Sequence, residues 1–268
     1  MYDFVYHRPT SLDQVLELLS SSDDPKIVAG GMTLLPTMKQ RLAQPSDLID
    51  LGGIAELSGV SEDAGQLVVG AMTRHVDVAH GPLVQRVIPA LAALADLIGD
   101  PQVRNRGTIG GSIANSDPAA DYPAAVLALD ATIVTNKRSI AADDYFVDLF
   151  ETALEDDEIV TSIRFCVPQR AAYMKFPNPA SRYAMVGVMV AELAGTVRVA
   201  VTGAGVCAFR VPAMEAALSA SMSPDAVAVI SIPDDQLNSD IHASAEYRAH
   251  LVTVMAKRAV AALVAGAA

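Results

Sequence analysis

Two pairs of adjacent glycines are the residues of this chain best suited to binding chemistry. The first pair is Gly30 and Gly31, and the second is Gly110 and Gly111, about eighty residues further along. Glycine lacks a Cβ, so its backbone adopts unusual dihedral angles and approaches a bulky ligand closely. Successive N–H groups at such a turn, followed by a helix N-terminus, bind anionic oxygens. Two such turns together predict a ligand with two phosphates, held from both sides.

Polar side chains surround the second pair. Thr108 and Ser112 carry hydroxyls and Asn115 carries an amide, all of which form hydrogen bonds with phosphate or sugar oxygens. Arg104 and Arg106 would neutralise a pyrophosphate, unless they are solvated or hold the loop through carboxylates. For both glycine pairs the alternative is a bend required only by packing.

Asp121 follows the second pair by ten residues. A carboxylate at this place suits ribose or ribityl hydroxyls, as acidic residues do in other dinucleotide sites. The alternative is that Asp121 is the N-cap of a helix beginning near Pro123. His75 follows a predicted strand and would face a ligand, although a single histidine is more often satisfied within the protein.

A third glycine motif competes with these two. The segment 199–208 combines a strand with the pattern G-x-G-x-x-A from Gly203, and Asp225 lies about twenty residues further on. A nicotinamide-binding fingerprint requires a helix to begin within the motif, but Pro212 delays the next helix. We therefore interpret this motif as structural, with a nicotinamide site as the minority alternative.

Composition limits the classes of partner. The chain has 268 residues, of which 51% are hydrophobic, and a net charge of −12. This length predicts two domains or lobes, and the acidity argues against nucleic acid or an anionic membrane surface as partner. The start Met1-Tyr2-Asp3-Phe4 lacks the basic and apolar pattern of a secretory signal, so we expect a cytoplasmic protein.

The sequence offers no metal site of its own. Cys166 and Cys207 are too few for an iron–sulfur cluster that needs four cysteines, and we expect no disulfide between them in the cytosol. The five histidines show no ligand spacing. If cluster chemistry is involved, another chain must supply it.

The surrounding pattern predicts elements that would position both glycine pairs. Ser11 and Gln14 indicate a capped helix near the N-terminus. The first glycine pair would lie at the carboxyl end of a strand in a β-α-β unit, where open α/β sheets bind ligands. We expect strands over 26–29, 47–51, 66–70, 131–135, 158–167, 186–193 and 196–202, helices over 34–42, 89–98, 123–129, 212–219 and 244–264, and a polar loop over 99–107.

Taken together, these residues resemble the FAD-binding medium subunit of molybdenum hydroxylases of the carbon monoxide dehydrogenase and xanthine dehydrogenase type. The resemblance runs along nearly the whole chain. Its motifs are Met1–Ser11, Ala29-Gly30-Gly31-x-x-Leu34-Leu35-Pro36-x-Met38-Lys39, Arg104–Ser112, Asp117–Ala124 and Ala245-Glu246-Tyr247-Arg248-x-His250-Leu251.

The resemblance implies an α+β fold. A two-subdomain α/β FAD-binding domain of the vanillyl-alcohol-oxidase (PCMH) type would occupy residues 1–171, with subdomains over about 1–55 and 56–171. A small α+β C-terminal domain of the CO dehydrogenase flavoprotein type would occupy residues 172–268.

The resemblance also implies which residues bind the cofactor. Two segments would hold the diphosphate, Asp121 would bind the ribityl or ribose region, and three residues would lie near the flavin ring. The full set is Val28, Ala29, Gly30, Gly31, Met32, Thr33, Leu34, Leu35, Thr108, Ile109, Gly110, Gly111, Ser112, Asp121, Val160, Lys175 and Tyr183.

Four residues bear on how the flavin would be held and tuned. Met32 and Thr33 stand where the family usually has His-Ser or Gln-Ser, so a polar group is lost at Met32. Arg182 stands where an acidic residue is common before the tyrosine. Lys175 would lie at the pyrimidine end of the flavin and favour its reduced, anionic form.

The implied function is electron transfer. A large subunit with a molybdenum–pterin centre would oxidise the substrate, and a small subunit with two [2Fe–2S] clusters would pass electrons to FAD in this chain. FAD would then reduce quinone, NAD or oxygen, in a dimer of heterotrimers. The alternatives are a stand-alone FAD-dependent reductase or oxidase and a non-catalytic nucleotide-binding scaffold.

Overall fold

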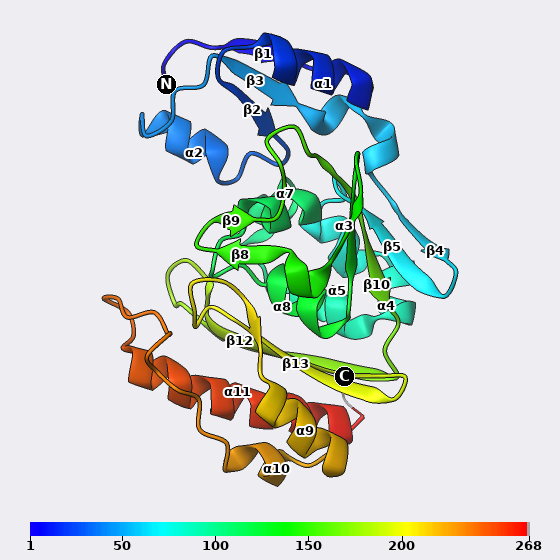
Figure 1. The fold of residues 1–268 in the computed structure, drawn as a ribbon, viewed down its shortest axis with the longest axis vertical. Helices are drawn as coiled ribbons and strands as arrows, with labels where there is room; N and C mark the ends of the chain where they lie inside the picture. Colours follow the sequence, from blue (N-terminus) through cyan, green and yellow to red (C-terminus); the bar gives the residue numbers. More distant parts are fainter. Residues whose placement is uncertain (267–268) are drawn as a thin grey trace.

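The structure, a computed structural model, describes residues 1–266. Figure 1 shows three parts stacked along the long axis: an N-terminal sheet with two helices, a middle sheet with several helices, and a C-terminal sheet covered by the long helix α11. Among these residues, no helix combines the length and the apolar character that crossing a bilayer requires.

The N-terminal part is a small parallel sheet of order β1-β3-β2. Ser11 caps α1 by accepting a hydrogen bond from the Gln14 amide, as predicted. The unit β2-α2-β3 is also confirmed, and it places Gly30 and Gly31 just after β2. Helix α2 ends earlier than predicted, and Arg41 beyond it has a φ of +62°. The elements are β1 (Val5–His7), α1 (Leu12–Ser21), β2 (Pro25–Val28), α2 (Leu34–Lys39) and β3 (Asp47–Asp50), followed by the 3-10 turns η1 (Leu51–Gly53) and η2 (Ala55–Leu57).

The middle part is built on an antiparallel sheet of order β4-β5-β10-β6-β7. Its inward residues alternate with outward ones, as in Leu67 and Val69 of β5, which are fully buried. The strands are β4 (Val60–Asp63), β5 (Gln66–Gly70), β6 (Thr132–Thr135), β7 (Ser139–Ala141) and β10 (Val160–Cys166), with the 3-10 turn η3 (Ala142–Asp144) and a separate hairpin of β8 (Phe146–Asp148) and β9 (Glu151–Thr152).

Short helices pack around this middle sheet. The polar segment 99–107, which was predicted to be a loop, contains the helical turn α6, because Asp100 accepts a hydrogen bond from the Val103 amide and Pro101 fits the first helical position. The helices are α3 (His75–His80), α4 (Pro82–Val87), α5 (Pro89–Asp96), α6 (Pro101–Arg104), α7 (Ile109–Asn115) and α8 (Tyr122–Ala128).

The C-terminal part is an antiparallel sheet of order β11-β12-β13-β14 with three helices. The strands predicted over 186–193 and 196–202 are observed, and they pair as a hairpin about Gly195, with Leu193 opposite Thr196. The helix predicted over 244–264 is α11, and Ser244 caps it by accepting a hydrogen bond from the Tyr247 amide. The elements are β11 (Arg170–Pro177), β12 (Ala184–Leu193), β13 (Thr196–Thr202), β14 (Phe209–Arg210), α9 (Pro212–Ala220), α10 (Pro224–Ala228) and α11 (Ala245–Val264).

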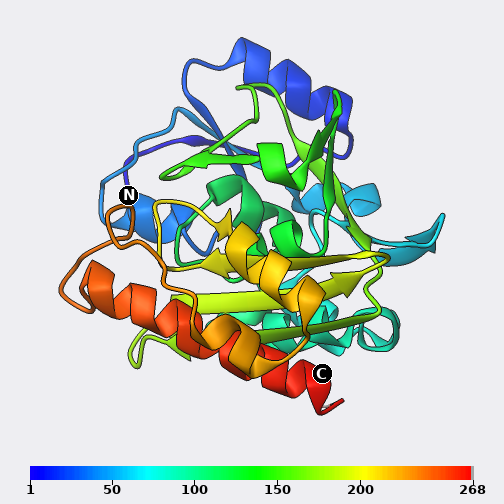
Figure 2. The ribbon, with the colours of Figure 1, turned by 60° about the horizontal axis from the view of Figure 1, so that its bottom comes forward.

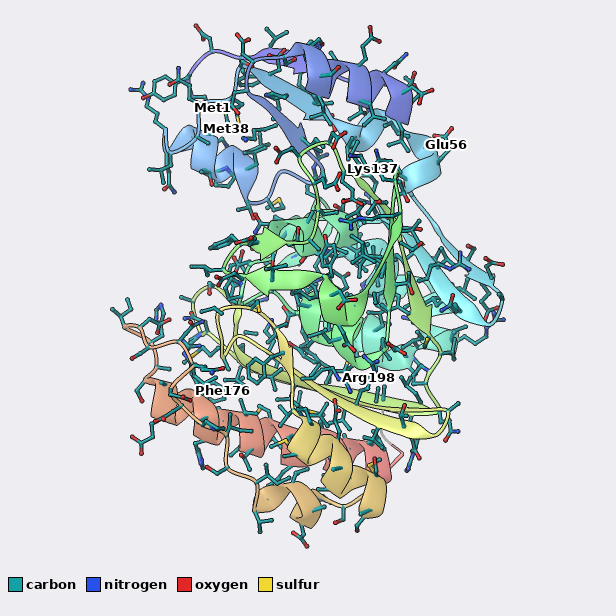
Figure 3. All side chains as sticks on the ribbon, in the orientation of Figure 1. Met1, Met38, Glu56, Lys137, Phe176 and Arg198 are labelled. Carbon is teal, nitrogen blue, oxygen red and sulfur yellow. The ribbon has the colours of Figure 1, made fainter. Side chains whose placement is uncertain are left out.

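Both faces of this last sheet are buried. Val188 and Val190 of β12 pack with α11, whereas Met189 and Ala191 belong to the core of the middle part. Figure 2 shows α11 lying across the strands on the outer face. Arg198 of β13, labelled in Figure 3, pairs with carboxylates of the middle part. The C-terminal sheet is therefore packed closely against the part that contains the second glycine pair.

Candidate functional site

A cavity of about 430 Å³ lies where the two glycine motifs meet. Most of the predicted site residues line it. They are Val28, Ala29, Gly30, Gly31, Met32, Thr33, Leu34, Thr108, Gly110, Gly111, Ser112, Asp121, Val160 and Tyr183. Of the remaining predicted residues, Leu35, Ile109 and Lys175 do not line the cavity, and Ile109 is fully buried in the core of the middle part.

The two glycine motifs contact each other directly. A Cβ added to Gly30 would lie 2.2 Å from the Arg106 carbonyl oxygen and 2.6 Å from the Gly107 Cα. A Cβ added to Gly111 would lie 3.2 Å from the Ala29 Cβ. At Gly30 the missing side chain therefore serves the contact between the motifs, and the packing alternative holds for this residue.

The first motif offers free backbone donors. Leu35 and Thr37 donate their amide hydrogens back to Gly31 and Thr33, which begins helix α2. The turn 30–33 lies between strand β2 and this helix. Within residues 1–266, its backbone amides have no hydrogen-bond acceptor. Gly31 has a φ of +73°, the left-handed conformation that glycine tolerates. Successive unpaired N–H groups around such a residue form a concave anion-binding turn.

The second motif differs from this expectation. It is not an open loop but the N-cap and first turn of α7, with Thr108 as the N-cap. The amides of residues 109–112 are already used inside the protein, so most of the predicted second set of free donors is absent from the described residues. The bonds run from Ile109 to the Thr73 carbonyl, from Gly110 to the Ala71 carbonyl, from Gly111 to the Thr108 hydroxyl and from Ser112 to the Thr108 carbonyl.

The segment 71–75 thus supports the second motif through these hydrogen bonds. The close contact at Gly110, where a Cβ would lie 2.5 Å from the Ala71 Cβ, explains this glycine by packing. The carbonyls that accept the Ile109 and Gly110 amides belong to residues nearly forty positions earlier in the chain, so no local sequence pattern predicted these bonds.

Asp121 is held by two residues of β11. Asp121 occupies the N-cap position of α8, as the alternative expected, but its side chain makes no cap bond to that helix. Instead the Tyr173 hydroxyl donates to Oδ1 at 2.6 Å, and the Lys175 ammonium donates to Oδ2 at 2.9 Å. Burial raises the pKa of the Asp121 carboxyl, while the Lys175 charge and the hydrogen bonds act in the opposite direction.

This pairing changes the expectation for Lys175. The Lys175 side chain is 3% exposed, and it also donates to the Leu97 carbonyl at 3.1 Å. Because Asp121 neutralises its charge, the lysine acts on the cavity as half of an ion pair rather than as a free cation. Sequence reasoning placed both residues near the ligand but missed their direct contact.

The cavity also contains residues that were not predicted to bind. Glu158 lines it with a fully buried side chain, and hydrogen bonds from Arg138, and then from Thr135, lower its pKa to about 2. Lys26 and Arg182 are the cations among its lining residues. Arg104, by contrast, donates to the Ile98 carbonyl at 3.0 Å, which supports its alternative role of holding the loop.

His75 also lines the cavity, but it is not the satisfied histidine that the sequence favoured. It is 5% exposed, and its Nδ1 has no hydrogen-bond partner within the described part of the chain. Burial, and secondarily the Arg104 charge, lowers its pKa to about 4. The imidazole is therefore neutral at physiological pH.

The competing glycine motif is structural. Gly203 follows β13 with a φ of +83°, and the chain forms β14 before α9 begins at Pro212. No helix begins within the motif, so it lacks the geometry of a nicotinamide site.

Comparison with known proteins bears directly on this geometry. Residues 2–169 match the family model described as "FAD binding domain in molybdopterin dehydrogenase". The chain belongs to this family. It is 38% identical over 271 residues to the nicotine 6-hydroxylase medium subunit of Paenarthrobacter nicotinovorans, covering 95% of each chain. It is 37% identical over 279 residues to the carbon monoxide dehydrogenase medium chain of Hydrogenophaga pseudoflava, covering 96% of this chain and 95% of that one.

Solved structures agree. Carbon monoxide dehydrogenase from Hydrogenophaga pseudoflava matches with a TM-score of 0.88 at 37% identity, covering 98% of both chains. Reconstituted CO dehydrogenase from Oligotropha carboxidovorans matches with a TM-score of 0.91 at 32% identity, again covering 98% of both. The chain therefore has the fold of these FAD-binding medium subunits and is a flavoprotein subunit of a molybdenum-hydroxylase type of oxidoreductase.

The residues of the cavity fit FAD. The turn 30–33 has unpaired amides that would receive phosphate oxygens, and Lys26, which is ion-paired with Asp24 at 3.3 Å, lines the same cavity. Asp121 retains acceptor capacity for sugar hydroxyls, because each carboxylate oxygen accepts more than one hydrogen bond.

Proposed function

We propose that this chain is the FAD-binding electron-transfer subunit of a heteromeric molybdenum hydroxylase most like aerobic carbon monoxide dehydrogenase. The observation that carries the proposal is the turn 30–33, whose unpaired amides line a cavity in a chain of this family. Bound FAD would supply the redox chemistry, taking up single electrons and releasing pairs.

The chain's own residues would bind and orient this cofactor. Gly31 and its neighbours would hold the diphosphate through main-chain amides, and the second motif would contribute the Ser112 hydroxyl and a close backbone. Asp121 would accept hydrogen bonds from ribityl or ribose hydroxyls. Tyr183, which is 46% exposed, would lie beside the flavin at the cavity mouth. We retain as the proposed site Val28, Ala29, Gly30, Gly31, Met32, Thr33, Leu34, Leu35, Thr108, Ile109, Gly110, Gly111, Ser112, Asp121, Val160, Lys175 and Tyr183.

Two partner chains follow from this role. A large subunit would hold the molybdenum–pterin centre, and a small subunit would deliver electrons from two [2Fe–2S] clusters, in a dimer of heterotrimers in the cytoplasm. The names "medium subunit" and "medium chain" of the relatives support assembly with larger and smaller chains. The external acceptor would be quinone, NAD or oxygen.

The decisive experiment is purification of the native complex with analysis for molybdenum, iron and flavin. We expect one FAD per copy of this chain, together with molybdenum and iron in co-purifying subunits. Turnover by the isolated chain with a two-electron donor would favour a stand-alone reductase, and a colourless protein would favour a scaffold.

A single substitution tests the site. In Gly111→Val the new Cβ would lie 2.9 Å from the Thr108 Oγ1 and 3.2 Å from the Ala29 Cβ, so it would push the two motifs apart where they line the cavity. We expect loss of FAD with retention of the fold. A variant that keeps stoichiometric flavin would contradict the assignment of this motif.

A further inference from the structure

Tyr173 reaches Asp121 across a gap left by a glycine. Lys175 of β11 pairs with Gly187 of β12, and Tyr173 lies two residues earlier on the same face of β11. A Cβ added to Gly187 would lie 2.2 Å from the Tyr173 hydroxyl oxygen and 2.8 Å from its Cζ. Any side chain at position 187 would therefore displace the end of the tyrosine ring.

The hydroxyl at the end of that ring has one specific partner. It donates to Asp121 Oδ1 at 2.6 Å, while Lys175 donates to Oδ2, so each carboxylate oxygen receives one bond from β11. Asp121 is 4% exposed and Tyr173 is 7% exposed. A charge-assisted hydrogen bond in such a buried place fixes the acceptor's direction and is stronger than a neutral one.

This arrangement is not a general property of the buried tyrosines in this protein. Tyr122 and Tyr145 are fully buried, yet neither hydroxyl has a hydrogen-bond partner among residues 1–266. Tyr173 is different because its hydroxyl meets a carboxylate that lines the cavity.

We propose that Tyr173 is a positioning residue for the cofactor site: it orients the Asp121 carboxylate toward the cavity, and Gly187 is glycine so that the tyrosine can reach it. This inference rests on the proposed function, in which Asp121 receives the sugar hydroxyls of FAD. It makes the C-terminal sheet a working part of a site that the two glycine motifs otherwise form.

The first test compares Tyr173→Phe with Tyr145→Phe in the full chain. FAD is titrated into flavin-free protein between pH 5.5 and 8.5, and binding is followed by flavin fluorescence. We expect Tyr173→Phe to bind FAD about tenfold more weakly at pH 7, the effect of losing one bond to a charged group. Tyr145→Phe removes a hydroxyl without a partner and should bind like the unsubstituted chain.

The pH profile separates positioning from packing. Without the Tyr173 hydroxyl, the Asp121 carboxylate is less stabilised, so its pKa rises further. We therefore expect FAD affinity in Tyr173→Phe to fall as the pH is lowered and to recover partly at pH 8.5, while the unsubstituted chain shows a flatter profile. A loss that is the same at every pH would mean that the tyrosine only fills space, and it would overturn the inference.

Gly187→Ala provides an independent route to the same result. Alone, it should weaken FAD binding about as much as Tyr173→Phe, because the methyl group displaces the hydroxyl. Added to Tyr173→Phe, it should cost less than about twofold more, because the hydroxyl bond to Asp121 is already gone and only the ring, with its Cζ 2.8 Å from the new Cβ, still has to shift. Additive losses would show that Gly187 and Tyr173 act separately and would contradict the proposal.

FAD titration distinguishes failure of the proposed function from failure of the positioning role alone. If the unsubstituted chain, alone or with its partner chains, binds no FAD at any pH, the proposed function fails and this inference fails with it. If it binds FAD and Tyr173→Phe binds equally well with the same pH profile, only the positioning role is wrong.

Discussion

Gly31 and Gly65 have nearly the same positive φ, +73° and +77°, in very different surroundings. A Cβ on Gly31 would lie 2.8 Å from the Leu35 Cδ1, whereas a Cβ on Gly65 would meet nothing within 4 Å. The backbone strain of an alanine is thus comparable at the two positions, about 1–2 kcal/mol. Only Gly31 belongs to the turn with unpaired amides.

We predict that Gly31→Ala loses at least tenfold in FAD affinity, because the strained turn no longer directs its amides into the cavity. Gly65→Ala should lower the melting temperature without changing FAD binding. Flavin titration and thermal unfolding of both variants check this. Equal effects of the two variants on FAD binding would show that the turn is not the anion site.

His75 gives a second prediction for a single residue. Its folded-state pKa is about 4, below the ordinary value of 6.5, so the unfolded chain takes up a proton first as the pH falls. The unfolding free energy should therefore decrease between pH 6.5 and pH 4, by up to about 3 kcal/mol from this group.

The test is urea unfolding of His75→Phe and His80→Phe across that pH range. His75→Phe should flatten the decrease, since no proton uptake remains at this position. His80 ends the same helix with a side chain that is 61% exposed, so His80→Phe should retain the decrease. An unchanged slope in His75→Phe would refute the assignment to this group.

At the scale of elements, much of the fold follows from local signals. The strand 66–70 is observed as predicted, because turns bound an apolar alternation there. The segment 99–107 shows the limit of such reasoning: Gly99 and Pro101 predicted a loop, but the Asp100 cap suffices for one helical turn. The caps at Ser11, Thr108 and Ser244 all accept the amide three residues on.

Two of these caps make a matched pair. Thr108→Ala and Ser244→Ala should each lower the unfolding free energy by about 1 kcal/mol, the usual effect of losing an N-cap. Only Thr108→Ala should also weaken FAD binding, because it loosens the first turn of α7 at the cavity. Calorimetry with and without FAD distinguishes the two, and an equal effect on FAD binding would contradict a role of α7 in the site.

At the scale of the whole molecule, the C-terminal sheet is joined to the middle part by both apolar and ionic contacts. Arg198 is 13% exposed and reaches Asp130 at 2.6 Å and Asp143 at 3.0 Å across this junction. Arg170 pairs with Glu192 within the sheet and is 43% exposed. The less exposed, bridging arginine should therefore matter more than the exposed one.

We predict that Arg198→Met destabilises the protein by about 1–2 kcal/mol, because it loses charge-assisted hydrogen bonds at a partly exposed site. Arg170→Met should change stability by less than about 0.5 kcal/mol. Urea unfolding of both variants measures these changes in the free energy of unfolding, with the dependence on urea concentration compared between the two. If the two variants are equally stable, the bridge across the junction contributes little.

The sequence by itself determined the order of elements, the position of Gly30 and Gly31 after a strand, the structural nature of the Gly203 motif and the family. These features depend on neighbours within a few residues or on a motif read along the chain. The tertiary structure alone decided which amides are free and which carboxylate meets which cation. The Ile109 and Gly110 amides are used by a segment nearly forty residues away, and Asp121 is held by Tyr173 and Lys175, more than fifty residues later. Hydrogen bonds act over about 3 Å, so their partners are fixed only when distant segments pack together.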